Sequence, residues 1–453
     1  MVNQRNPRHF LVVSTLLAAL LASPPILVSA QSQAGDVRSL DPDTRFYVAK
    51  PDHGAIEQIA DLTSSGDKAD AILIKKMIKT PQAVWFTRGA PKNVKQDVRH
   101  TVRRAAAKGT VPVLVAYNIP FRDCAQFSAG GATTVEEYLA WIDAFAAGIG
   151  DHEAVVILEP DGLGIIPWYK QFRGLPLEAT SYEWCQPAEA DEATAADDRF
   201  AMLNYAVDAL KARPNVSVYL DGTHSAWLAV GDAAHRLSQA GVGRADGFFL
   251  NVSNFQFTAN LIQYGSWISN CIAYAGTVTP GGFVDCPNQY WNGGPLPAKI
   301  AELLGEWNGV ALSSYGEWSD NTDVPELNTS GINLRYGNML GSTQPTAHFV
   351  IDTSRNGVGP WQPPSGVYPD PQDWCNPPDR GLGHQSTANT GVSLLDAYLW
   401  IKTPGESDSQ CTRGLGPAGT TIDPEWGLID PGANQWFPEM ALDLVHNATP
   451  PLP

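Results

Sequence analysis

Several aspartates in this chain directly follow short apolar stretches, where a carboxyl group could do acid–base chemistry. Asp161 comes after the run 155–158, and Asp123 comes after the run 111–117. Other polar residues in comparable positions are Asp221, Asn254, Asp352 and Asp408. A protonated carboxyl beside an ionised carboxylate can serve as general acid and base, which is the requirement of glycoside hydrolysis among other reactions.

Asp161 is the best candidate for the acid, because burial after an apolar strand raises the pKa of a carboxyl group. A neighbouring carboxylate would raise it further, and Asp123 is a good candidate for that neighbour. A purely structural interpretation is also open, since Asp and Asn are favoured as helix N-caps, and we expect about half of these residues to be caps. Asp123 could simply pair with Arg122, and Asp408 could be a solvated loop acid.

Runs of β-branched and aromatic residues predict strands at 46–48, 83–87, 111–117, 155–158, 216–220, 248–252, 348–351 and 397–401. Most runs do not alternate with polar residues, which is typical of strands buried on both faces of a parallel sheet. Helices are predicted between them at 94–108, 134–147, 197–212, 232–240 and 297–305. Strand–helix alternation on this scale predicts an α/β barrel, whose active site lies at the carboxyl ends of its strands.

Long segments rich in Pro, Gly and Trp are expected to form loops at 165–196, 255–296, 313–346, 353–392 and 409–435. They carry Trp168, Trp184, Trp267, Trp291, Trp361, Trp374 and Trp426. Aromatic rings above an acidic cleft suit a weakly charged ligand such as a sugar, whose C–H faces stack on them. The rings could equally hold the long loops down as local cores.

The beginning of the chain has the pattern of a signal peptide. A basic start precedes an apolar run, and small residues offer a cleavage site after Ala30. An uncleaved membrane anchor is the alternative. We expect residues 31–42 to be a short linker and 43–450 to be a single catalytic domain. The protein is then secreted, with no membrane contact after cleavage.

The charge of the chain excludes several classes of partner. A formal net charge of −17 would be repelled by a nucleic-acid backbone and disfavours a polybasic membrane contact. There is no GxGxxG turn after a predicted strand and no P-loop, so no nucleotide cofactor is expected.

Six cysteines, an even number in an exported chain, predict disulfides. They are Cys124, Cys185, Cys271, Cys286, Cys375 and Cys411. Their spacing does not choose a connectivity, although Cys271 and Cys286 are close enough to staple one loop. No CxxC or His-rich spacing occurs, so we expect no metal site.

Eight segments in order resemble the cellulases of glycoside hydrolase family 6, over most of residues 43–447. They are Ala83–Phe86, Tyr117–Cys124, Leu158–Asp161, Asp221–Leu228, Asn251–Phe255, Ile351–Gly357, Asp373–Asn376 and Trp400–Asp408. The resemblance implies cleavage of β-1,4-glucan with inversion, in a distorted, incomplete TIM-like parallel α/β barrel of seven strands.

The resemblance also implies roles for individual residues. Asp161 matches the general acid, and Asp123 matches the aspartate that keeps this acid protonated and helps to order the attacking water. Tyr117 matches a tyrosine that crowds the sugar at the cleavage point. Asp408 matches the proposed base, and water relayed through Ser128 toward Asp123 is the competing idea.

Other positions match further parts of the family's site. Asp221 matches another active-site aspartate, and Arg355 matches an arginine whose role we leave open beyond the electrostatics of the site. Positions that match substrate contacts are Trp85, His224, Trp227, Asn254, Trp374, Lys402 and Glu406. The family's disulfides correspond here to Cys124–Cys185 and Cys375–Cys411, which leaves Cys271–Cys286 as a local addition.

Three functions follow from this sequence. The leading one is a monomeric endo-β-1,4-glucanase that acts on cellulose or soluble β-1,4-glucan without a cofactor. A cellobiohydrolase with a roofed tunnel is the close alternative: the short spacing from Asp408 to Cys411 favours endo action, whereas the length of 409–435 favours the tunnel. A non-catalytic glucan-binding protein would keep the tryptophans but would not need Asp161 or Asp123.

Overall fold

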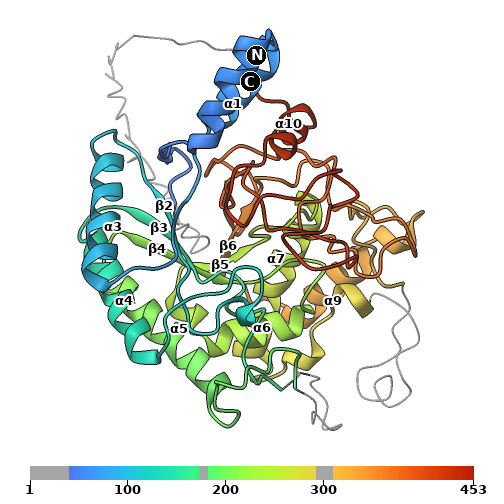
Figure 1. The fold of residues 1–453 in the computed structure, drawn as a ribbon. Helices are drawn as coiled ribbons and strands as arrows, with labels where there is room; N and C mark the ends of the chain where they lie inside the picture. The colour runs from blue at the N-terminus through green and yellow to red at the C-terminus, as the bar shows by residue number, and fades with distance from the viewer. Residues whose placement is uncertain (1–39, 171, 173–181, 292–309) are drawn as a thin grey trace, which may run out of the picture. The chain divides into compact units, whose positions relative to one another are not determined.

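Seven parallel strands form the centre of the fold (Figure 1). The computed structural model describes residues 40–170, 172, 182–291 and 310–453. The strands are β1 (Val84–Phe86), β2 (Val113–Ala116), β3 (Ala154–Leu158), β4 (Val216–Asp221), β5 (Gly247–Leu250), β6 (His348–Asp352) and β7 (Leu395–Leu399). They lie side by side in chain order, with β1 and β7 at the two ends of the curled sheet. The predicted incomplete, seven-stranded α/β barrel is therefore confirmed.

Alternate residues of each strand belong to two different cores. In β3, Val155 and Ile157 pack with the inward residues of the neighbouring strands. Ala154, Val156 and Leu158 pack on the other face, against the helices. Because both faces are buried, the strands lack polar alternation, as the sequence indicated.

The helices are α1 (His53–Ser65), α2 (Lys68–Met77), α3 (Pro91–Ala106), α4 (Val135–Ile149), α5 (Ala195–Lys211), α6 (Val230–Gln239), α7 (Thr258–Ala273), α9 (Ser330–Leu340) and α10 (Pro438–His446). Short helical turns are η1 (Asp123–Ala125), η2 (Val242–Arg244), η3 (Tyr274–Val278), η4 (Phe283–Asp285), η5 (Gln289–Trp291) and η6 (Pro325–Leu327). Figure 1 shows α3 to α6 along the outside of the sheet. Local sequence defines their starts: Pro91 opens α3, and the Thr134 side chain caps α4 by accepting the Glu137 N–H at 3.2 Å.

The four predicted helices within the described residues correspond to α3, α4, α5 and α6. The largest boundary difference is at the start of α3, which begins at 91 instead of 94. The helix predicted at 297–305 lies outside the described residues. So do the predicted signal peptide and most of the predicted linker. No described helix has the length and apolar character needed to cross a membrane.

Three sequence-based expectations about elements were wrong. The strand predicted at 46–48 is reduced to an isolated bridge between Phe46 and Val111. The segments 255–296 and 313–346, expected to be loops, contain α7 and α9. Neither α1 nor α2 was predicted. In α7 the aromatic Tyr264 and Trp267 are fully buried, so tertiary packing stabilises a helix whose local composition does not favour one.

The six cysteines form three disulfides, Cys124–Cys185, Cys271–Cys286 and Cys375–Cys411. This is the pairing that the resemblance implied. Two of the three bridges anchor segments next to the strand-end acids, because Cys124 follows Asp123 and Cys411 lies close to Asp408 in the chain.

Candidate active site

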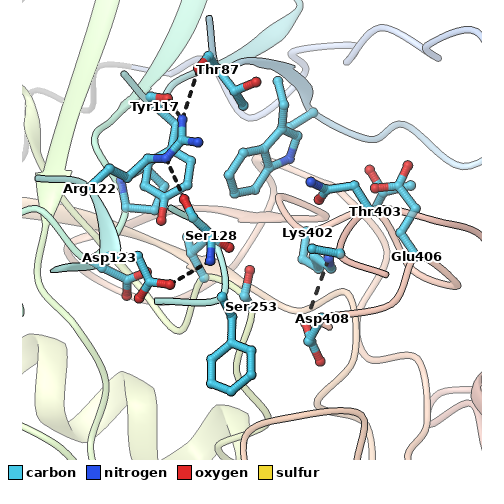
Figure 2. A pocket seen from close by; sticks show the side chains of 18 of the residues that line it. Thr87, Tyr117, Arg122, Asp123, Ser128, Ser253, Lys402, Thr403, Glu406 and Asp408 are labelled. Atoms are coloured by element: carbon cyan, nitrogen blue, oxygen red, sulfur yellow. Dashed lines mark hydrogen bonds and ion pairs between the residues drawn. The ribbon is translucent and has the colours of Figure 1, made fainter. Parts of the chain in front are cut away.

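A cleft of about 1380 Å³ lies at the carboxyl ends of the strands. Of the catalytic and substrate-contacting residues named from the sequence, those that line it are Trp85, Tyr117, Asp123, Ser128, Asp161, His224, Trp227, Asn254, Trp374, Lys402, Glu406 and Asp408. Figure 2 shows Asp123 and Ser128 on one side and Lys402 and Asp408 on the other. Ligand pockets usually measure about 300–1,000 Å³, so this cleft suits an extended ligand better than a single small molecule.

Asp161 sits on a turn just beyond β3 and has a left-handed backbone, with φ of 61°. Burial raises the pKa of its carboxyl group well above the usual value, and the nearby charges of Asp221 and Asp123 add to this effect. No described residue donates a hydrogen bond to this carboxyl. The raised pKa favours the protonated form, and the lack of a donor leaves the proton free to be delivered.

Asp221 ends β4 and is buried beneath the Asp161 turn, outside the cleft lining. Its carboxylate accepts the N–H groups of Leu163 at 3.1 Å, Gly164 at 3.0 Å and Thr223 at 2.9 Å. Burial raises the pKa of Asp221 to about 6. The structure thus places this residue where it acts on Asp161 through its charge and through the backbone.

Asp123 and Tyr117 form the wall next to Asp161. The Asp123 carboxylate accepts the Ser128 backbone N–H at 2.6 Å, and burial raises its pKa despite this bond and the charge of Arg122. The Arg122 guanidinium lies 4.5 Å from the centre of the Tyr117 ring. It also donates to the carbonyl oxygens of Thr87 at 2.9 Å and Ser128 at 2.8 Å (Figure 2). Arg122 thus acts on Asp123 through its charge and by fixing the loop that carries this carboxylate, and the described residues show no direct ion pair between the two.

Asp408 has the opposite electrostatic environment. Burial favours the neutral form, but Arg355 and Lys402 outweigh it and hold the pKa of Asp408 below its usual value. Arg355 Nη1 lies 2.8 Å from one carboxylate oxygen, and Lys402 Nζ lies 3.7 Å from the other. The Asn376 N–H donates to the same carboxylate at 3.0 Å. Asp408 is thus ionised, and Arg355 gains the role that the sequence left open: it is the main counter-charge.

Glu406 and His224 complete the polar lining. Burial raises the pKa of Glu406 to about 7, even though the charge of Lys402 opposes it. Burial also lowers the pKa of His224 to about 4, so this ring is neutral near pH 7. Its Nδ1 accepts the Ala226 N–H at 3.3 Å, which leaves the other ring nitrogen to donate to a ligand hydroxyl.

Aromatic side chains line the cleft along its length. Trp85 packs edge-on against Tyr117, with ring centres 5.6 Å apart. Trp227 rests on Gly164, where an added Cβ would lie 2.5 Å from the indole, so only glycine fits. Trp374 is 39% exposed, so its ring is accessible to a ligand in the cleft.

One aromatic residue of the cleft, Phe127, was not named from the sequence, and Trp184 was named only among the loop tryptophans. Phe127 packs edge-on against Trp374 at 5.2 Å and lines the cleft. Trp184 is 54% exposed and also lines it. The sequence offered one usable signal: Trp184 is next to Cys185, whose disulfide to Cys124 brings it beside the Asp123 loop.

The described residues offer one cluster with the geometry of a metal site, formed by Cys411, Asp423 and Asp430. It does not fit a metal ion. Cys411 is committed to a disulfide, and Asp423 pairs with Arg413 at 2.7 Å. The Asp430 carboxylate accepts a hydrogen bond from Asn376.

Comparisons with known proteins agree with one another. The sequence model of the glycosyl hydrolases family 6 matches residues 41–448. Endoglucanase A of Thermobispora bispora is 30% identical over 446 residues, covering 98% of this chain and 70% of that protein. Endoglucanase 1 of Streptomyces halstedii is 31% identical over 436 residues, covering 95% of this chain and 98% of that protein.

A solved structure gives the same result. The endoglucanase Cel6 from Mycobacterium tuberculosis, in complex with methyl-cellobiosyl-4-deoxy-4-thio-β-D-cellobioside, is 30% identical to this chain. The TM-score is 0.58, and the match covers 90% of this chain and 99% of that one.

Proposed function

This chain belongs to glycosyl hydrolase family 6, and we propose that it is a secreted endo-β-1,4-glucanase with Asp161 as the general acid and Asp408 as the base. Its substrates are cellulose or soluble β-1,4-glucan chains, and the reaction proceeds with inversion at the anomeric carbon. The observation that carries the residue assignment is that Asp408 pairs with Arg355 and Lys402, whereas Asp161 has acidic neighbours and no hydrogen-bond donor among the described residues; these surroundings displace the two pKa values in opposite directions.

The displaced pKa values support this division of roles. Asp161 keeps its proton and delivers it to the bridging oxygen, so that the leaving sugar departs as a neutral alcohol. The ionised Asp408 accepts a proton from a water molecule that attacks the other face of the sugar. Asp123 supports the protonated state of Asp161, and Tyr117 crowds the sugar between them. A water relay through Ser128 to Asp123 is the alternative route for the second proton.

Endo action is supported by the course of the long C-terminal segment. Of residues 409–435, only Ala433 and Asn434 line the cleft. The rest is held elsewhere: Arg413 binds Asp423, and Tyr368 donates to Glu425. A segment anchored in this way does not roof the described cleft, which favours attack within a chain over the tunnel of a cellobiohydrolase.

The three disulfides support export, because such bonds persist in oxidising compartments. We propose that residues 1–30 are a signal peptide, that 31–42 are a linker and that 43–450 form the catalytic domain of a monomer.

Replacing Asp161 with Ala tests the function. We expect kcat on barley β-glucan to fall by about 10²–10⁴, with oligosaccharide binding retained. Asp143→Ala, on the outer face of α4, is the matched control and should keep full activity. Proton NMR of fresh product should show the α-anomer first, and the viscosity of carboxymethyl-cellulose should fall before reducing sugar accumulates. A β-anomer, or an Asp161→Ala variant as active as the control, would contradict the proposal.

A further inference from the structure

Arg199 of α5 is a buried arginine that reaches the two loops carrying Asp161 and Asp123. Its guanidinium donates to the carbonyl oxygens of Gly162 and Ile165, both at 2.8 Å, on the turn that follows Asp161. It also donates to the carbonyl oxygen of Pro120 at 2.8 Å, three residues before Asp123. One side chain therefore joins the two turns.

Burying a charged guanidinium costs free energy, so its hydrogen bonds indicate what compensates this cost. Arg199 is 2% exposed, and no carboxylate lies within salt-bridge distance of it among the described residues. Burial lowers the pKa of its guanidinium to about 10. A buried cation without a direct ion pair persists only where its N–H groups are well satisfied. Here three backbone carbonyls accept hydrogen bonds from the two Nη groups, and all three belong to the two turns, while Nε has no partner among the described residues.

Glu159 makes the reciprocal connection. It lies two residues before Asp161 and is fully buried. Its carboxylate accepts the N–H groups of Asn118 at 2.9 Å and Ile119 at 3.0 Å, on the loop that leads to Asp123. The loop before Asp123 is thus held at its amides by Glu159 and at its carbonyl by Arg199. Its position relative to the Asp161 turn depends on both.

Arg236 differs from Arg199 in a way that isolates the role of Arg199. Arg236 donates to the Leu163 carbonyl at 2.9 Å, on the outer side of the same turn. It is neutralised by Asp232 at 2.8 Å and by Glu183. Its contacts hold the Asp161 turn against α6, and it makes no bond to the loop before Asp123. Among the described arginines, only Arg199 bonds to both turns.

We propose that Arg199 is a positioning residue for proton transfer: its forked contacts fix the Asp161 carboxyl relative to Asp123 and keep water from the junction. The proposal rests on the proposed function. Lysine keeps the charge but presents a compact ammonium on a flexible stem and cannot span the two turns in the same way. Without the fork, the turns separate and the Asp161 carboxyl becomes more solvated and less repelled by its neighbour.

The test compares Arg199→Lys with Arg380→Lys. Arg380 is the matched control, because it is half-buried and likewise donates to two loop carbonyls, of Gly359 at 2.6 Å and Pro378 at 2.9 Å, away from both turns. We expect kcat of Arg199→Lys on β-glucan to fall about 10–100-fold with little change in KM. The alkaline limb of its pH profile should move to lower pH, since the acid loses its proton more easily.

A second substrate separates positioning of the acid from general damage. Dinitrophenolate leaves without protonation, so a dinitrophenyl β-cellotrioside should lose much less rate in Arg199→Lys than β-glucan does. Glu159→Gln tests the same link from the other turn and should likewise lose less rate on the dinitrophenyl substrate than on β-glucan. This second variant provides the test if Arg199→Lys does not fold.

Two outcomes separate the inference from the proposed function. If the wild type is active and inverting but Arg199→Lys behaves like Arg380→Lys, or loses equal rate on both substrates with an unmoved alkaline limb, the inference is overturned and the function stands. If the wild type does not hydrolyse β-1,4-glucan at all, the proposed function itself fails.

Discussion

Two aspartates of one cleft acquire opposite chemistry from their surroundings. Asp161 has no hydrogen-bond donor among the described residues and two acidic neighbours, Asp221 and Asp123, so its neutral form is favoured. Asp408 is equally buried but lies between Arg355 and Lys402, so its ionised form is favoured. A carboxyl group therefore becomes an acid or a base through its contacts, which the residue type alone does not specify.

Replacing Arg355 with Met should move the acidic limb of the kcat/KM profile to higher pH. The guanidinium is the largest favourable influence on the Asp408 carboxylate, at 2.8 Å. Its removal raises the pKa of Asp408, so the base becomes protonated, and inactive, at a higher pH. Steady-state kinetics from pH 3 to 9 measures the shift.

Arg244→Met is the control, because Arg244 pairs with Asp208 on the outer helices, at 2.8 Å. Its profile should match the wild type. An acidic limb that stays in place in Arg355→Met would remove Asp408 as the base and favour the relay through Ser128 to Asp123.

The elements that the sequence predicted well are those whose own residues show a clear strand or helix pattern. Strands buried on both faces, such as β3, show continuous apolar runs, and α3 to α6 show helical patterns. Helix α7 was missed because its aromatic and glycine residues favour a helix only once they are packed. Residues of the eight motifs meet in one cleft because strand ends in a parallel barrel converge on one edge.

Strand-end acids could not be sorted into chemical and structural roles from sequence. Asp352 ends β6 in the same way as Asp221 ends β4, and like Asp221 it accepts backbone N–H groups with its carboxylate, whereas the Asp161 carboxyl accepts none from the described residues. The donors include Ser253 at 3.2 Å and Lys402 at 2.9 Å, and Asp352 is buried outside the cleft. These two donors follow β5 and β7 and are far from Asp352 in the chain, so only the fold reveals that Asp352 joins β6 to the segments after those strands.

The Cys124–Cys185 bridge is expected to matter for activity as well as stability. It closes a sequence separation of 61 residues beside Asp123, and a loop of this length corresponds to about 4 kcal/mol in the chain-entropy model. We expect the double variant Cys124→Ala/Cys185→Ala to lose both thermal stability and most of its kcat, since the Asp123 turn is left without its anchor. Calorimetry and β-glucan assays measure the two effects.

The Cys271–Cys286 bridge is the matched comparison, with a separation of 15 residues and no contribution to the cleft lining. Removing it should cost about 3 kcal/mol by the same model, with kcat retained below the unfolding temperature. Equal losses of kcat in the two double variants would mean that the first bridge has no particular role at the Asp123 turn.

At the scale of the whole molecule, buried carboxyl groups link folding to pH. Burial raises the pKa of Asp221 to about 6, of Glu159 to about 7, of Glu406 to about 7 and of Asp430 to about 7. The folded protein therefore binds more protons than the unfolded chain between roughly pH 4 and 7. The net charge of −17 acts in the same direction, because repulsion grows as more carboxyls ionise.

These shifts predict that the free energy of unfolding is highest at mildly acidic pH. A raised folded-state pKa contributes stability that is complete below the unfolded value, near 4, and is lost as pH rises through about 7. His224, whose pKa burial lowers to about 4, acts in the opposite sense between about pH 4 and 6.5, but it is one group against these four carboxyls. Asp408, with a lowered pKa, also acts in the opposite sense, at still lower pH. Urea unfolding from pH 4.5 to 8.5 should show a steady decline, and Glu406→Gln should decline less steeply, because it removes one of the contributing groups. A wild type that becomes more stable toward pH 8, or a variant whose curve runs parallel to it, would show that these carboxyls do not retain their protons in the folded state.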